Sequence, residues 1–100
     1  YTSLFYNAIH PAAVVAKNIT IGKSVMIMGG AVVNPLVCLG NGVIINTSAV
    51  IEHECLIADF AHVAPGAVLA GNVTIGRRSF IGANAVIKQG VIIGENVIVG

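Results

Sequence analysis

Two carboxylates flank an imidazole in the segment Glu52-His53-Glu54, and no other part of the sequence combines these groups. An imidazole beside a carboxylate can act as a general base, because the carboxylate selects one ring tautomer and raises the basicity of the other nitrogen. A second imidazole, His62, follows nine residues after His53. The alternative interpretation of Glu52-His53-Glu54 is a solvated turn with a chance ion pair, and spacing alone leaves both interpretations open.

Four other polar groups have types that could bind a ligand. Asn34 and Asn46 could each contact a substrate, and Asn46 lies nearer to the acidic segment in the sequence. The pair Arg77-Arg78 could attract a phosphate, although we interpret it as a solvated corner. His10 has no acidic neighbour and is interpreted as a surface residue at one end of the fold.

The elements that must position these residues follow from a repeat of six. Every sixth residue from Ile9 to Val99 is Ile, Val or Leu, without a slip of register. Counted from this aliphatic, the fifth place is small or β-branched in nearly every hexad, and the fourth place is Asn or Gly in eight of fifteen. Asn and Gly adopt positive φ at the lowest cost, so the fourth place predicts a left-handed corner.

Each hexad is therefore predicted to be a short strand with one inward aliphatic, followed by a corner. A helix is excluded because a period of six does not match 3.6 residues per turn. Three hexads form a triangular coil of 18 residues, and successive coils stack through parallel hydrogen bonds about 4.8 Å apart. The predicted fold is all-β, a parallel β-helix of about five coils. His53 and Glu54 then fall at a corner, side by side and pointing outward.

Composition excludes two classes of protein. The chain is 56% apolar and 9% charged, and no charged residue occurs between Ser24 and Ile51. That stretch is long enough to span a bilayer, but its evenly spaced Gly, Asn and Pro residues indicate a soluble repeat instead. A net charge of +1 without a basic stripe gives no surface for nucleic acid.

The two cysteines, Cys38 and Cys55, fit no metal or redox spacing. We interpret them as small buried hydrophobic residues in a reducing compartment, and we expect a cytoplasmic protein.

The segment from Asn46 to Gly76, NTSAVIEHECLIADFAHVAPGAVLAGNVTIG, resembles the NeuD-type sugar O- and N-acetyltransferases. These include sialic acid O-acetyltransferases and enzymes that acetylate UDP-4-amino sugars. The matching features are N-T-x-A, E-H-E-C, D-F-x-H-V-A-P-G-A and G-N-V-x-I-G, which cover about a third of the chain. The repeat itself resembles the hexapeptide-repeat proteins, and this resemblance implies that the β-helix is left-handed, although the general rule for parallel crossovers favours the right-handed form.

The resemblance implies an acetyltransferase that uses acetyl-CoA as co-substrate and no metal. His53 would be the general base that takes a proton from the acceptor, and Glu54 would orient His53. Asn46 would contact the acceptor, a sugar or nucleotide-sugar. Transfer would be direct, without an acetyl-cysteine intermediate, because Cys55 falls at an inward place of the repeat.

The resemblance also implies how the cofactor and the subunits are arranged. His62 would lie beside the acetyl end of acetyl-CoA, and the backbone around Gly71 and Gly82-Ala83 would line the pantetheine groove. The protein would be a homotrimer, with each active site in a groove between two prisms.

Residues 1–8 lie outside the repeat and are predicted to be an N-terminal cap or a linker remnant, whereas residues 9–100 are predicted to form the β-helical acyltransferase domain. Family members usually carry an N-terminal α/β domain and further C-terminal coils that end in a V-P-A-K-like tail. Neither occurs here, and the repeat is still running at Gly100, so we expect missing residues or a partner there. These flanks would define the acceptor and complete the acetyl-CoA site, so whether these 100 residues are active by themselves stays open.

Two alternative functions use the same fold. A trimeric β-helix that serves only as an assembly module would leave the E-H-E-C and H-V-A-P-G matches unexplained. A γ-type carbonic anhydrase needs three histidines on one zinc, and His10 falls more than two coils from His53, too far for bonds of about 2 Å.

Overall fold

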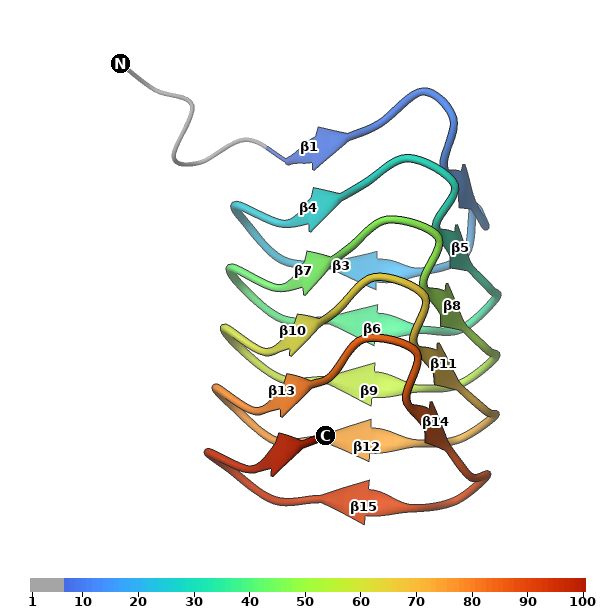
Figure 1. Ribbon diagram of the computed structural model, residues 1–100. Helices are drawn as coiled ribbons and strands as arrows, with labels where there is room; N and C mark the ends of the chain where they lie inside the picture. Colours follow the sequence, from blue (N-terminus) through green and yellow to red (C-terminus); the bar gives the residue numbers. More distant parts are fainter. Residues whose placement is uncertain (1–6) are drawn as a thin grey trace.

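The computed structural model describes residues 7–100 as a left-handed parallel β-helix of stacked triangular coils (Figure 1). Its sixteen strands are each two residues long and form three parallel sheets, which we name faces A, B and C. Face A contains β1 (Ala8–Ile9), β4 (Met26–Ile27), β7 (Ile44–Ile45), β10 (His62–Val63), β13 (Phe80–Ile81) and β16 (Ile98–Val99). The fold predicted from the period of six is confirmed.

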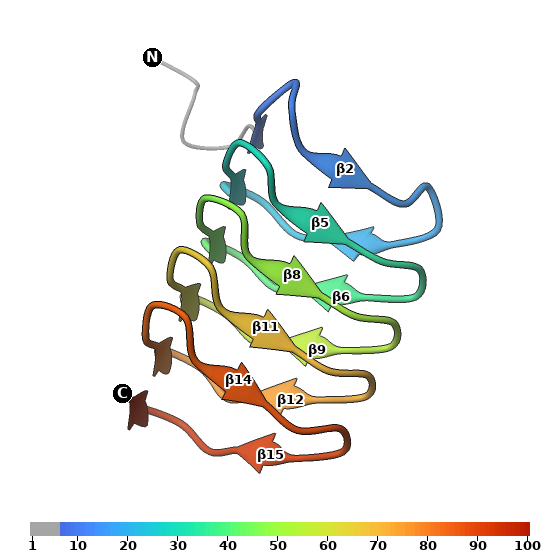
Figure 2. The ribbon, with the colours of Figure 1, turned by 45° about the vertical axis from the view of Figure 1, so that its right-hand side comes forward.

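The other two sheets have five strands each. Face B contains β2 (Val14–Val15), β5 (Val32–Val33), β8 (Val50–Ile51), β11 (Val68–Leu69) and β14 (Val86–Ile87), which form one column in Figure 2. Face C contains β3 (Thr20–Ile21), β6 (Cys38–Leu39), β9 (Leu56–Ile57), β12 (Thr74–Ile75) and β15 (Ile92–Ile93). The chain runs from face A to B to C in each coil, so it turns at an A/B, a B/C and a C/A corner.

The first coil begins slightly before the predicted boundary. Residues 1–6 of the predicted cap or linker remnant lie outside the described residues. Ala8 begins β1, and Asn7 Oδ1 accepts a hydrogen bond of 2.9 Å from the N–H of Val25 in the next coil. Both residues therefore take part in the coil.

The second residue of each strand points into the prism. On face A the inward aliphatics stack in register every 18 residues, and from Ile27 to Ile81 they are at most 1% exposed. The fifth-place residue beside them is alanine at every A/B corner, which leaves room for the aliphatics in a narrow interior. The first residue of each strand points outward, and Val14 and Val86 on face B are 65% and 67% exposed.

Every corner from Ser24 to Asn96 uses a left-handed residue at the fourth place, nine of them non-glycine and four glycine. This confirms the predicted corner, but Asn18, which the pattern included, has no positive φ. The sequence also missed residues such as Leu36 and Phe60, which adopt φ of 65° and 61° although a side chain there costs roughly 1–2 kcal/mol. Stacking explains this, because from Gly30 to Asn96 each fourth-place N–H bonds to the coil before it, as Glu54 N–H does to Pro35 O at 3.1 Å.

Among residues 7–100 no helix has the length and apolar character needed to cross a membrane.

Candidate active site

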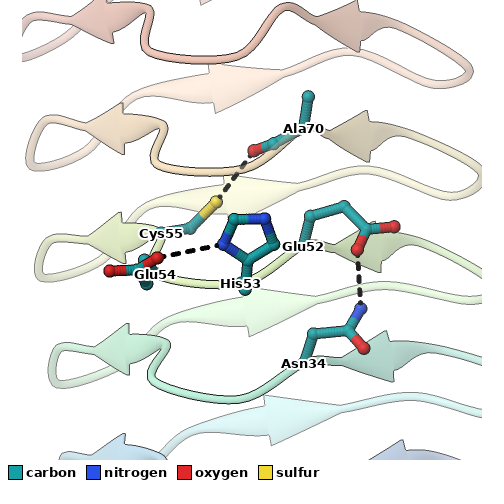
Figure 3. A network of polar contacts seen from close by, with 6 residues as sticks. All are labelled: Asn34, Glu52, His53, Glu54, Cys55 and Ala70. Carbon is teal, nitrogen blue, oxygen red and sulfur yellow. Dashed lines mark hydrogen bonds and ion pairs between the residues drawn. The ribbon is translucent and has the colours of Figure 1, made fainter.

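His53 and Glu54 occupy the B/C corner between β8 and β9, as the repeat predicted. Their side chains are 55% and 57% exposed, and His53 Nδ1 lies 3.1 Å from Glu54 Oε1 (Figure 3). A carboxylate only accepts hydrogen bonds, so His53 Nδ1 carries the ring proton and donates a hydrogen bond to Glu54. This tautomer leaves Nε2 with a free lone pair, which is the form that a general base needs.

The Nε2 edge of the His53 ring faces Gly71, one coil further along the chain. The two corners are joined by a hydrogen bond of 2.9 Å from Asn72 N–H to His53 O. A Cβ at residue 71 would lie 2.8 Å from both Nε2 and Cε1 of His53, so any side chain there would displace the ring. The N–H of Gly71 donates no hydrogen bond within the described part of the chain. A free donor therefore lies beside a free base.

Cys55 lies directly behind this corner and is 1% exposed. Its Sγ–H donates to the carbonyl oxygen of Ala70 at 3.1 Å, which ties the thiol to the peptide before Gly71 (Figure 3). Burial raises the pKa of the Cys55 thiol, so the thiolate is disfavoured. An acetyl-cysteine intermediate is thus unsupported, and the thiol joins this corner to the next coil. Cys38 differs from the prediction, because it is only half-buried on the outward side of β6.

Glu52 points along face B and away from the His53–Glu54 pair. Its Oε1 accepts a hydrogen bond of 3.2 Å from Asn34 Nδ2 in the coil before it, and the same amide donates to Ile51 O at 3.1 Å (Figure 3). The Asn34 amide therefore serves contacts between coils, although the sequence left it open as a substrate ligand.

Asn46 and His62 form a second polar pair, on face A. Asn46 Oδ1 accepts hydrogen bonds from the N–H and the hydroxyl of Thr47, so its Nδ2 faces His62 Nε2 at 3.0 Å. An amide NH₂ can only donate, so His62 Nε2 accepts and the ring proton sits on Nδ1. Burial lowers the pKa of His62 below its ordinary value of 6.5. Phe80 packs edge-on against the ring, with centroids 5.0 Å apart. His62 is thus a neutral donor.

The two polar pairs lie apart within one chain. His53 stands at the B/C corner, Asn46 and His62 stand on face A, and the width of face B separates them. Five extended residues span roughly 16 Å, at about 3.3 Å per residue. The described residues of a single chain therefore do not bring the predicted base and the predicted acetyl-side residues together.

Gly82 and Ala83 follow β13, at and beside the A/B corner, towards the C-terminal end from Asn46. Gly82 is buried, and a Cβ there would lie 2.7 Å from Val99 O, so close packing of the next coil requires glycine. Ala83 is exposed. The Gly82 N–H donates to Val99 O at 2.7 Å and its carbonyl oxygen accepts from Ala85 N–H at 3.2 Å. The predicted contact of Gly82 and Ala83 with pantetheine stays a prediction.

Two arginines stand at the C/A corner and contact other side chains there. Arg77 Nε lies 3.6 Å from Glu95 Oε1, and the Arg78 guanidinium lies 6.0 Å from the centre of the Phe60 ring. No three His, Cys, Asp or Glu side chains within residues 7–100 are grouped so that they could hold a metal ion.

Sequence reasoning missed three of these contacts. The His53–Gly71 contact has a signal in the sequence, because residues 18 apart stack at the same corner. The Cys55–Ala70 and Asn46–His62 bonds, which join residues 15 and 16 apart, have no such signal because they run diagonally between coils.

Comparison with known proteins finds similar sequences and similar folds. A family model described as the hexapeptide repeat of succinyl-transferase matches residues 72–100. No curated protein matches the chain. The acetyltransferase domain of PglB from Neisseria gonorrhoeae FA1090, solved with acetyl coenzyme A, superposes with a TM-score of 0.91 at 41% identity over 92% of this chain.

Two further solved structures are similar. The H141A mutant of GDP-perosamine N-acetyl transferase from Caulobacter crescentus, in complex with CoA and GDP-perosamine, superposes with a TM-score of 0.93 at 39% identity over 94% of this chain. This chain covers 45% of each of these two acetyltransferase chains, so it spans less than half their length. The CcmM N-terminal domain in complex with CcmN, at 17% identity and a TM-score of 0.61, shares the fold alone. The predicted resemblance to sugar acetyltransferases is confirmed.

Proposed function

We propose that this hexapeptide-repeat β-helix, which is similar to sugar N-acetyltransferases, transfers an acetyl group from acetyl-CoA to an amine or hydroxyl of a sugar or nucleotide-sugar. The observation that carries the proposal is the His53 ring, held by Glu54 as a free base at Nε2 and packed against the bare backbone of Gly71. The similar structures with bound acetyl-CoA, CoA and GDP-perosamine support the two substrate classes.

In the proposed reaction the acceptor attacks the thioester carbon while Nε2 of His53 takes the proton of the attacking amine or hydroxyl. Glu54 stabilises the imidazolium that forms, and the Gly71 N–H is placed to donate to the thioester oxygen as negative charge develops on it. Collapse of the tetrahedral intermediate breaks the carbon–sulfur bond, and the imidazolium returns the proton to the departing thiolate. The products are the acetylated acceptor and CoA thiol.

The proposal includes a trimer in which face B of each chain lies towards the threefold axis. The outward residue of every strand on face B is valine, and these five form one continuous column: Val14, Val32, Val50, Val68 and Val86. The charged corner between faces C and A then points to solvent. This arrangement brings the B/C corner of one chain to the A/B corner of the next, so His53 meets Asn46 and His62 of the partner subunit.

In that groove the acetyl end of acetyl-CoA lies between Gly71 of one chain and His62 of the partner subunit. The neutral His62 ring, with its proton on Nδ1, supplies a hydrogen-bond donor, and the pantetheine continues past Gly82 and Ala83 of the partner subunit. Asn46 of the partner subunit contacts the acceptor. The free thiols of Cys38 and Cys55 fit a reducing compartment, and we place the protein in the cytoplasm.

Calorimetry of acetyl-CoA binding, combined with light scattering during size-exclusion chromatography, tests the proposal. We expect a trimeric mass and one acetyl-CoA site per chain. Val50→Asp should dissociate the trimer and abolish binding, whereas Thr74→Asp, an outward position of similar burial on face C, should change neither. A trimer without acetyl-CoA binding would favour a non-catalytic assembly module, and a monomer that binds acetyl-CoA would contradict the shared groove.

A further inference from the structure

The residues at the third place of successive B/C corners form a column, and this column extends from His53 towards the N-terminal end of the β-helix. The third-place residues stack every 18 positions as Lys17, Pro35, His53 and Gly71, because the strands on both sides of this corner are in register. Hydrogen bonds join the successive corners: Leu36 N–H donates to Asn18 O at 3.1 Å, and Glu54 N–H donates to Pro35 O at 3.1 Å. Lys17 therefore stands two coils from His53, about 10 Å along the axis at about 4.8 Å per coil.

The direction of the His53 ring decides which substrate meets Lys17. Nε2 leans towards Gly71, on the C-terminal side, and the proposed thioester lies there. The acceptor must approach the thioester carbon from the opposite side, so the part of the acceptor beyond the reacting amine or hydroxyl extends past Pro35 towards Lys17. The distance of two coils matches one pyranose ring followed by the phosphates on its anomeric oxygen.

The charges along the chain favour an anion at this place. Between Asn7 and Ile51 the charged side chains are Lys17 and Lys23, and neither forms an ion pair within the described residues. Carboxylates begin at Glu52. Lys17 is exposed at the B/C corner, whereas Lys23 stands at the C/A corner, on the opposite side of the prism from the groove.

The facing wall of the proposed groove carries a second donor at the same level. On the partner subunit His10, Met28 and Asn46 stack in one column, which puts His10 two coils above Asn46. His10 Nδ1 accepts a hydrogen bond of 2.9 Å from Ala12 N–H, so its Nε2 carries the proton and can donate. The ring borders a hollow of about 220 Å³ that is also lined by Ile9 and Met28.

We infer that Lys17, with His10 of the partner subunit, binds the diphosphate of a diphospho-sugar acceptor and so selects such acceptors over free sugars. This inference rests on the proposed function, because it assigns the acceptor's position from that of the thioester. An ammonium and an imidazole N–H on opposite walls would hold two phosphates through charge-assisted hydrogen bonds.

The test is initial-rate kinetics of the full chain at saturating acetyl-CoA with three acceptors that share one 4-amino sugar. The sugar is supplied as a nucleoside diphosphate, as a farnesyl diphosphate and as a methyl glycoside. We expect Lys17→Ala to lower kcat/KM about tenfold for the nucleoside diphosphate, mainly through KM, and to leave the methyl glycoside unchanged. Lys17→Arg should restore most of the loss, and Lys23→Ala is the matched control with no expected effect.

The outcomes separate the two proposals. A tenfold loss with the nucleoside diphosphate alone supports a nucleotide-sugar, and an equal loss with the farnesyl diphosphate assigns the site to the diphosphate whatever its ester. Equal kcat/KM for Lys17→Ala and Lys23→Ala, or an equal loss with the methyl glycoside, overturns the inference while the proposed function stands. If the wild-type chain acetylates none of the three acceptors, the proposed function fails and the inference fails with it.

Discussion

The B/C and C/A corners share one backbone geometry but use their polar side chains differently. Both place residues with positive φ at the fourth position, 63° for Glu54 at the B/C corner and 61° for Phe60 at the C/A corner. At the C/A corner Asp59 Oδ1 accepts from Asn41 N–H at 2.8 Å, and Asn41 Oδ1 accepts from Lys23 N–H at 2.9 Å. These side chains link one coil to the next and so serve the fold.

At the B/C corner the side chains at the third and fourth places bind one another or nothing within the described chain. His53 and Glu54 pair within one coil, and Gly71 beside them has no side chain. Their polar groups are therefore available to a ligand. The comparison teaches that a repeat can carry two kinds of corner, and that the corner proposed to be functional is marked by polar groups that do not hold the coils together.

Replacement of the base should give the largest effect. We expect His53→Ala to lower kcat by about 10²–10⁴, because a positioned general base typically contributes this much. The melting temperature should stay near that of the wild type, since the ring is half-exposed and its loss leaves the corner's backbone hydrogen bonds in place. Steady-state kinetics and thermal melting measure both, and near-normal turnover in this variant would rule out His53 as the base.

A methyl group at Gly71 should give the next largest effect. Gly71→Ala is expected to lower kcat by roughly 10- to 100-fold, because the Cβ lies 2.8 Å from His53 Nε2 and must push the ring out of place. Gly94→Ala is the matched control on face C, where a Cβ would approach nothing nearer than Val97 Cγ2 at 4.0 Å. Equal rates for the two variants would contradict the assigned contact.

Removal of a C/A corner acceptor should affect stability instead of catalysis. Asp59→Ala leaves the Asn41 N–H without its acceptor and should lower the free energy of unfolding by about 1–2 kcal/mol, while kcat stays within twofold. Denaturant unfolding and kinetics on the same sample give both values. A loss of activity without a loss of stability would erase the distinction between the two corners.

The pH dependence of stability should show the smallest effect. Burial lowers the pKa of His62 in the folded chain, so the unfolded chain binds the proton more readily. The contribution of His62 to the free energy of unfolding should therefore be complete above pH 6.5, the ordinary pKa of histidine. It should decrease as the pH drops below 6.5 towards the lower pKa of the folded chain. Denaturant unfolding across this range should show a flatter pH dependence of stability in His62→Gln, and an unchanged pH dependence would contradict a half-buried neutral ring.

Much of the fold could be predicted because the physical signal is local and repeated. An inward aliphatic such as Ile45 must recur every six residues if each side of a narrow triangular coil is one hexad long, and residues at corners must tolerate positive φ. The spacing also predicted that His53 and Glu54 lie side by side on the outside of a corner, which the 3.1 Å contact confirms.

Tertiary structure alone decided which groups are free and which are engaged. The sequence could not distinguish Asn34, whose amide is bonded to Glu52, from Asn46, whose amide sets the tautomer of His62. It could not show that Cys55 braces the peptide before Gly71. These contacts depend on rotamers and on diagonal approaches between coils, and neither is encoded by a period of six. The sequence by itself determined the prism and the corner that carries His53 and Glu54, and the stacking of coils determined what the His53 ring can reach.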